Sequence, residues 1–139
     1  LSITMCTYLR NTEIDVQIAE NDIEVYKIVK IKHCKWYAPF RDIPYESNAL
    51  SSKLETPKKN NYGDLESDFH TINIGLHSYA YKMDAIHSLQ WLIAEKYSSL
   101  IVVKAIIPKN SRYYRSTVPK EIYVSDHLNL GEEIVYVSM

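Results

Sequence analysis

Residues 100–108 read LIVVKAIIP, a nearly continuous apolar run that only Lys104 interrupts. The run is short and rich in β-branched side chains, which favours a strand buried on both faces over a helix. The sequence PKNS at residues 108–111 then supplies turn-forming side chains. We therefore predict a central strand here, and the rest of the fold is interpreted outward from it.

Residues 82–97, just before this run, are predicted to form the principal helix. An apolar stripe recurs there at helical spacing, with Met83, Ile86, Leu89, Ile93 and Tyr97, widened by Ala85 and Leu92. Asp84 near the start suits the positive end of the helix dipole. Trp91 lies off the stripe, so either a loop covers it or it is exposed for a partner.

Further strands are predicted on both sides of these two elements. Residues 23–31 alternate with period two, although Lys27 interrupts an otherwise apolar face. Residues 69–80 are typical of a strand in which Gly75 marks a bend or a close approach. Shorter strands are expected at residues 112–117, where the strand lies at an edge, and at 121–125 and 133–138, with a turn near Gly131. This order predicts one α+β domain over residues 1–139, with a twisted, mostly antiparallel sheet and one helix packed on it.

The pattern is weaker in two segments. Residues 13–22 fit either a short strand or a helical turn. Residues 32–68 contain three prolines and the polar run KKNN, which is typical of irregular structure. Within this segment we expect a mobile loop over residues 46–66.

The composition limits the kinds of partner. A chain of 139 residues is long enough for one self-sufficient core. Its net charge of −1 argues against a domain whose main task is to hold a phosphate backbone, so a nucleic-acid partner is not expected. The 12 tyrosines, against 2 Phe and 2 Trp, suit either a half-wet sheet surface or a tyrosine-lined cleft.

The cysteines and the N-terminus bear on location. Cys6 and Cys34 lack metal-type spacing and are expected to be buried free thiols, which fits a cytoplasmic protein. No apolar run of about 18 residues predicts a membrane span, and the first ten residues lack the pattern of a secretory signal. Met5 is the first plausible initiator, so residues 1–4 are expected to be foreign to the native chain.

Motifs that hold metals or phosphates are not found. None of the five histidines forms an HxH or HExxH pattern, and the glycine-rich phosphate loops and the G-x-S-x-G elbow are missing too. We therefore predict no metal site. Residues 109–115, KNSRYYR, alternate cationic and aromatic side chains, which suits either single-stranded nucleic acid or a solvated edge strand.

The order of elements resembles the ADP-ribosyltransferase family. Gly75, Leu76 and Ser78 match the family's second-strand motif, and Ala85 matches an early helix position. Glu121, which opens a late strand, stands where the family has its catalytic glutamate, and Lys27 stands where it has Arg or His. The resemblance covers residues 23–137 and implies an ADP-ribosyltransferase-like fold. Residues 19–27 and 107–114 are also similar to small bacterial and phage proteins of no assigned activity.

The resemblance implies a set of site residues. Cleavage of nicotinamide from NAD builds an oxocarbenium-like sugar, whose charge the carboxylate of Glu121 would stabilise. Ser78 would hold Glu121 in place, and Lys27 would complete the catalytic set. Cofactor binding is expected from the second strand and the residues after it: Gly75, His77, Tyr79 and Tyr81, with Tyr79 or Tyr81 stacking on nicotinamide.

Departures from the family pattern decide the order of our hypotheses. Ala80 replaces a second hydroxyl, and Pro119 stands where arginine-modifying members have Glu or Gln. We therefore predict first a small binding or interaction module, a degenerate relative of the family with a protein or small-molecule partner. The alternative is an active NAD-dependent ADP-ribosyltransferase. A weaker alternative is a single-strand nucleic-acid binder that uses Arg112, Tyr113, Tyr114 and Arg115. An interaction module would expose an apolar or tyrosine-rich patch around Trp91 or Trp36.

Overall fold

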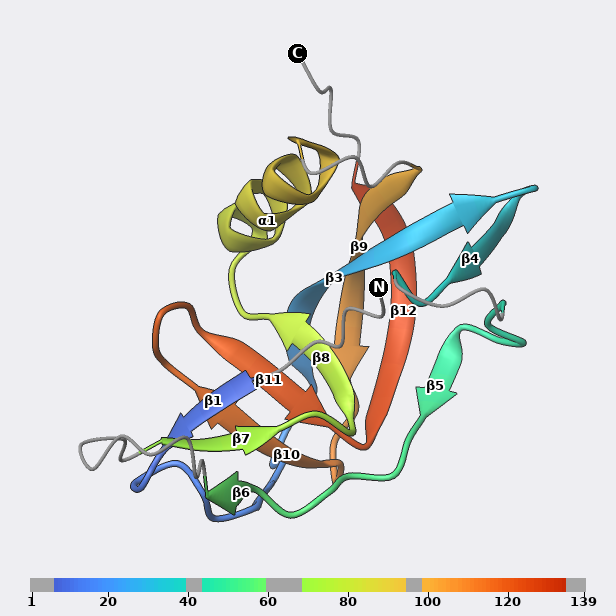
Figure 1. Ribbon diagram of the computed structural model, residues 1–139. Coiled ribbons are helices and arrows are strands. Elements are labelled where there is room, and N and C mark those ends of the chain that lie inside the picture. Colours follow the sequence, from blue (N-terminus) through green and yellow to red (C-terminus); the bar gives the residue numbers. More distant parts are fainter. Residues whose placement is uncertain (1–6, 40–43, 60–68, 95–98, 135–139) are drawn as a thin grey trace.

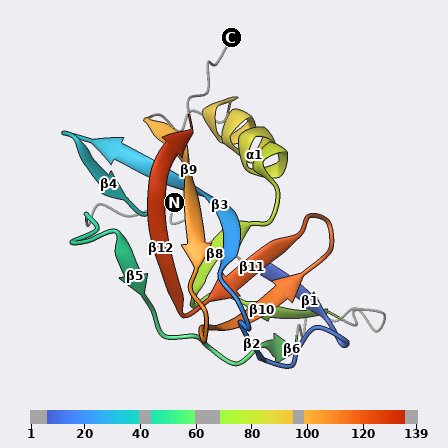
Figure 2. The ribbon, with the colours of Figure 1, turned by 180° about the vertical axis from the view of Figure 1, so that it is seen from behind.

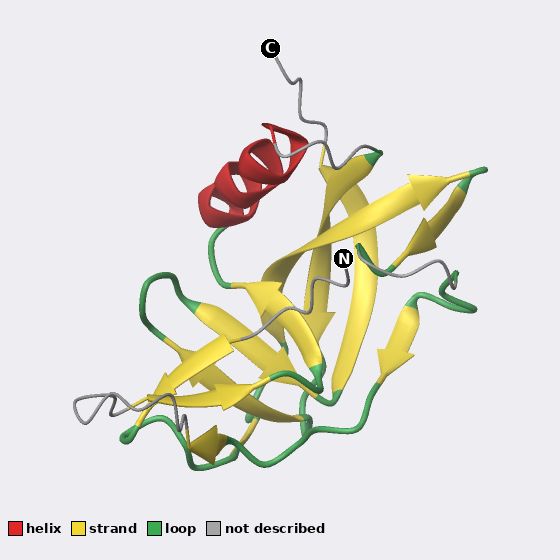
Figure 3. Cartoon of the chain, viewed as in Figure 1, coloured by secondary structure: helices red, strands yellow, loops and turns green. Residues whose placement is uncertain are grey.

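A computed structural model of the chain describes residues 7–39, 44–59, 69–94 and 99–134 (Figure 1). The described elements are, in chain order, β1 (Thr7–Arg10), β2 (Gln17–Ile18), β3 (Ile23–Lys32), β4 (Lys35–Tyr37), β5 (Ala49–Ser51), β6 (Lys58–Lys59), β7 (Phe69–Ile72), β8 (Leu76–Tyr79), α1 (Lys82–Ala94), β9 (Leu100–Ile107), β10 (Arg112–Ser116), β11 (Ile122–Ser125) and β12 (His127–Ile134). Strands dominate, with one helix beside them (Figure 3). This confirms the predicted α+β class with one principal helix.

The main sheet has nine strands in the order β2-β10-β11-β8-β3-β9-β12-β5, with β4 paired to β3. Its strand pairings are antiparallel. The apolar run at residues 100–107 forms β9, which pairs with β3 on one side and with β12 on the other. The predicted central strand is therefore confirmed. A continuous apolar run fits this position because both faces of β9 are covered.

Each face of β3 contributes to a different core. Val25 and Val29 are fully buried on one face, in a cluster with Val103 and Leu128. Ile28 is buried on the other face, beneath the helix. The period-two alternation of a strand explains this division.

Helix α1 packs on β3 and β9 and lies beside them in both views (Figures 1 and 2). Its buried side chains are Ala85, Ile86, Leu89 and Leu92. The sequence prediction was wrong for Met83 and Ile93, which are 54% and 38% exposed. The buried stripe consists of residues 85, 86, 89 and 92 and is narrower than the predicted one, so Met83 and Ile93 lie beside it. Tyr97 lies outside the described residues.

A second, three-stranded sheet in the order β1-β7-β6 lies against β10 and β11. Leu9 of β1 and Ile72 of β7 are fully buried with Tyr114 and Val124 of the main sheet. The Ser116 hydroxyl also donates a hydrogen bond of 2.6 Å to the carbonyl of Tyr8. The lower end of the main sheet is thus covered by strands and the upper end by the helix (Figure 1).

Gly75 divides the segment that was predicted as one strand over residues 69–80. The two halves, β7 and β8, belong to different sheets. Gly75 has a φ of +151°, and a Cβ atom placed on it would lie 2.5 Å from Cγ1 of Val124. Its backbone therefore bends and approaches β11 closely, which confirms the predicted role of this glycine.

Two other sequence predictions need correction. The turn near Gly131 is absent, because β12 continues through residue 131 with a register shift between Leu130 and Glu133. A Cβ atom at Gly131 would lie 3.1 Å from the Lys104 carbonyl oxygen, so this glycine serves a close approach of strands. Residues 135–138 lie outside the described part of the chain.

Cys34 is exposed, not buried, because it occupies the turn between β3 and β4. Cys6 is not among the described residues.

The weakly patterned segments contain short strands. Residues 17–18 form β2, which pairs with the first two residues of β10 and covers part of that expected edge. Within the expected loop at 46–66, β5 pairs with β12 and β6 pairs with β7. Residues 60–66 are not described. Strands this short carry too few residues to show a period.

Candidate functional site

Strands β3, β8 and β11 are neighbours and bring together residues that are distant in the sequence. Tyr79 of β8 lies opposite Tyr26 of β3 and opposite Ile122 of β11. One residue further along, the antiparallel register places Lys27 beside Ser78, and Ser78 lies opposite Tyr123. Lys27, Ser78 and Tyr123 therefore share one face of the sheet.

Lys27 is buried within this face, with an exposed fraction of only 6%. Its Nζ donates a hydrogen bond of 2.8 Å to the carbonyl oxygen of His77. Burial lowers the pKa of the ammonium group from 10.5 to about 8. No carboxylate among the described residues pairs with it, so its charge is balanced only by backbone dipoles.

Ser78 and His77 are also buried, but on opposite faces of β8. Within the described part of the chain, the Ser78 hydroxyl and the His77 Nε2 atom have no hydrogen-bond partner. Burial, followed by the nearby charge of Lys27, lowers the pKa of His77 from 6.5 to about 4. His77 is therefore neutral near pH 7, and no ligand reaches Lys27 or Ser78 without a rearrangement of the side chains over them.

Glu121 precedes β11 and lies on the Lys27 face at the exit of β8. Its backbone carbonyl accepts a hydrogen bond of 3.0 Å from the amide of Ala80, and it stands two residues before Tyr123. The carboxylate accepts hydrogen bonds from Nε and Nη2 of Arg115 in an ion pair. The Glu121 side chain is 13% exposed and the Arg115 side chain 46%, so the cation forms the outer part of the pair.

Tyrosines surround this ion pair. Tyr81 is 60% exposed, and a hydrogen bond with Glu121 raises the pKa of its hydroxyl. Tyr123 lies opposite Arg115 on the neighbouring strand, and its ring contacts that of Tyr113 edge to face at 5.5 Å. We call Tyr81, Arg115, Glu121 and Tyr123 the Arg115 site.

The structure distributes the predicted site residues over three environments. Glu121 and Tyr81 lie together in the Arg115 site, while Lys27 and Ser78 lie deeper on the same face. Tyr79 points to the other face and packs against the helix cluster, near Ser88. His77 is buried, and Gly75 is half-buried against Val124 and Leu54. Of the two tyrosines expected to stack on nicotinamide, only Tyr81 is open to solvent.

Sequence reasoning missed Arg115 and Tyr123 as members of the site. Arg115 was placed only in the KNSRYYR segment. The available signal was the short connection between β10 and β11, which returns the chain so that residue 115 faces the start of the next strand.

The KNSRYYR segment does not form one continuous binding strip. Arg112 and Arg115 point to opposite faces of β10, because odd spacing reverses the side of a strand. Tyr114 is only 6% exposed and belongs to the core beneath the small sheet. The geometry therefore offers no row of stacked rings and cations along β10.

The two tryptophans differ in environment. Trp91 is 61% exposed on the outer side of α1, where no described loop covers it. Trp36 is half-buried in β4 and lines a hollow between the β3–β4 hairpin and residues 44–48. Either position is thus open to a partner.

Some classes of site are not represented in the described ranges. No three His, Cys, Asp or Glu side chains gather there so that they could hold a metal ion. The only described helix, α1, is too short to cross a bilayer. Comparisons with protein-family models, curated protein sequences and solved structures found no match to this chain.

Proposed function

We propose that the chain is a small binding domain of ADP-ribosyltransferase-like architecture, whose ligand is NAD or a closely related dinucleotide. The observation that carries the proposal is the Arg115–Glu121 ion pair, with the exposed ring of Tyr81 beside it. A partly exposed guanidinium suits a phosphate, and a neighbouring phenol ring suits a planar base. Glu121 holds the guanidinium in one orientation, which lowers the entropy lost on binding.

Binding is favoured over group transfer because Glu121 is already engaged. A catalytic carboxylate must present its charge to the developing oxocarbenium ion. Here the charge is compensated by Arg115, and the carboxylate is mostly covered. Lys27 and Ser78, which would complete the catalytic set, are buried beneath the surface. These features fit a degenerate relative that keeps the ligand but not the turnover.

The test is a calorimetric titration with NAD of the wild-type protein and of two matched variants. Arg115→Gln removes the guanidinium of the site, whereas Arg112→Gln removes an exposed guanidinium from the opposite face of β10. Loss of a charged hydrogen-bond donor should weaken binding by about tenfold or more for Arg115→Gln. Arg112→Gln should bind as the wild type does. An absence of saturable NAD binding at millimolar levels, or equal losses in both variants, would remove the proposal.

An active transferase is the second candidate. It is favoured by the position of Lys27 on β3, of Ser78 on the neighbouring β8 and of Glu121 just before β11. In that reaction the bond between the ribose C1′ and nicotinamide breaks, nicotinamide leaves with the electron pair, and a nucleophile captures the sugar cation. Release of free nicotinamide from NAD should then be detectable by chromatography. It should be lost in Glu121→Gln and retained in Glu133→Gln, an exposed carboxylate on β12. If bound NAD stays intact over long incubation, the transferase candidate falls and the binding domain stands.

A further inference from the structure

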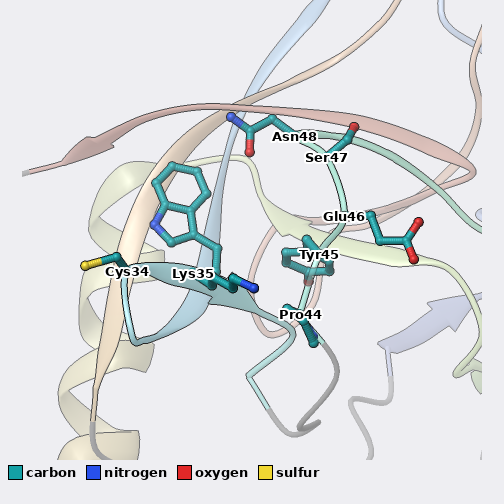
Figure 4. A pocket seen from close by; sticks show the side chains of 8 residues that line it. Cys34, Lys35, Pro44, Tyr45, Glu46, Ser47 and Asn48 are labelled. Atoms are coloured by element: carbon teal, nitrogen blue, oxygen red, sulfur yellow. The ribbon is translucent and has the colours of Figure 1, made fainter.

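A hollow separate from the Arg115 site lies between the β3–β4 hairpin and the segment before β5 (Figure 4). Its volume is about 550 Å³, within the usual range of small-molecule pockets. The lining residues are Cys34, Lys35, Trp36, Pro44, Tyr45, Glu46, Ser47 and Asn48. Most of their side chains are exposed, so the hollow opens directly to solvent.

The aromatic floor of this hollow is fixed by the fold. Trp36 and Tyr45 are half-buried and pack against the core cluster around Val29 and Val103. The amide of Tyr45 donates a hydrogen bond of 2.9 Å to the Trp36 carbonyl, which holds the two residues side by side. Tyr37 and Pro44 form a bridge next to them. Two rings are therefore held on the core while part of each is left uncovered.

The polar rim is anchored through its backbone and leaves side chains available. The carbonyl of Asn48 accepts a hydrogen bond of 2.7 Å from the amide of Leu130, and the Ser47 hydroxyl accepts one of 2.9 Å from the amide of Ala49. Asn48 lines the same hollow as Trp36, and Figure 4 shows its side chain on the segment beside Ser47. Lys35 and Glu46 form no ion pair with a described residue. Their charges balance, so the lining carries no net charge.

We infer that this hollow binds a neutral carbohydrate ring. A pyranose has apolar C–H faces that pack on aromatic rings, and hydroxyl groups that need both donors and acceptors around the edge. Trp36 and Tyr45 supply the rings, while Asn48, Lys35 and Glu46 supply amide, donor and acceptor groups. An anionic ligand would need an excess of cations, which the lining of this hollow lacks. The inference is therefore independent of the proposed function.

The experiment uses Trp36 as its own reporter. The chain has two tryptophans, so in a Trp91→Phe background the selectively excited tryptophan fluorescence comes from Trp36 alone. Maltose, cellobiose and diacetylchitobiose are titrated separately into this protein. At least one should change the emission saturably at millimolar concentrations. Asn48→Ala should weaken that response by about tenfold, since an uncharged sugar loses a paired amide. Asn21→Ala, at an exposed position before β3, is the matched control and should leave it unchanged.

Three results would overturn the inference. One is the absence of a saturable response to every disaccharide. Another is a response to inorganic phosphate or free nicotinamide without one to sugars, since that would assign the hollow to an anion or a planar heterocycle. The third is an equal loss of response in the Asn48 and Asn21 variants. NAD binding at the Arg115 site is measured separately by calorimetry, so failure of either proposal is recognised without the other.

Discussion

The Nζ atom of Lys27 lies 2.8 Å from the backbone carbonyl oxygen of His77, in the middle of the main sheet. This contact joins β3 to β8 beneath the surface and leaves the amine otherwise without a charged partner among the described residues. A buried ammonium group that is balanced only by a carbonyl dipole costs free energy. The neighbouring hydroxyl of Ser78 also lacks a hydrogen-bond partner in the ranges that the structure describes. Burial of these two polar groups therefore lowers the stability of the folded chain at the centre of the sheet.

Lys27→Met should change how the free energy of unfolding depends on pH. The pKa of Lys27 is lowered from 10.5 to about 8 in the folded chain, so the unfolded chain binds more protons between these values. Wild-type stability therefore gains a rising contribution with pH from 8 to 10.5, of about 3 kcal/mol in total. Below pH 8 the Met variant should be the more stable protein, and the difference should shrink toward pH 10.5. Denaturant unfolding at several pH values measures this, and a difference that is constant with pH would contradict it.

His77→Gln should change how the free energy of unfolding depends on pH below 6.5. Because the pKa of His77 is lowered from 6.5 to about 4, the unfolded chain binds more protons in that window. Wild-type stability should therefore fall by about 3 kcal/mol as the pH is lowered from 6.5 to 4. In the Gln variant, the free energy of unfolding should not show this decrease. His127→Gln, at an exposed position of β12, should keep it, and identical pH profiles for the two variants would refute the assignment.

Gly75→Ala should destabilise the chain strongly. Its new Cβ would lie 2.5 Å from Cγ1 of Val124 and 2.9 Å from Cδ1 of Leu54, at a φ that disfavours side chains. Overpacking and backbone strain of this kind cost about 2–4 kcal/mol together. Gly131→Ala should cost less, because its nearest contact would be 3.1 Å and its φ is not in the strained region. Thermal unfolding compares them, and a larger effect at Gly131 would argue against the described bend.

Two alanine substitutions can test which face of helix α1 is buried. Leu89 is 2% exposed, so Leu89→Ala should cost about 2–4 kcal/mol of unfolding free energy. Met83 is 54% exposed, so Met83→Ala should change it by less than about 1 kcal/mol. Denaturant unfolding of both variants measures the contrast. Comparable losses would mean that the helix buries the stripe expected from sequence.

Local periodicity was sufficient to predict the strongest elements. The apolar run at β9, the alternation of β3 and the helix α1 are all visible in the order of residues. The anomaly at Lys27 was also visible, because a charged residue stood on an apolar face. Its burial could not be predicted, since whether that face is open or covered depends on strands placed elsewhere in the sequence.

Pairings between distant segments could not be predicted in the same way. That β8 lies between β3 and β11 is set by packing of the whole sheet, not by the four residues of β8. The ion pair of Arg115 with Glu121 depends on the register of β10 and β11, and a shift by one residue would send Arg115 to the other face. The role of Gly131 was also ambiguous in the sequence, because both a turn and a close approach of two strands favour glycine.

The central claim is that the Arg115 site binds a dinucleotide, and amide chemical shifts of the ¹⁵N-labelled protein test it most directly. Addition of NAD should shift the signals of Tyr81, Arg115, Glu121 and Tyr123 saturably, while those of Trp36 and Asn48 stay in place. Unchanged signals up to millimolar NAD, or shifts confined to the Trp36 hollow, would contradict the account.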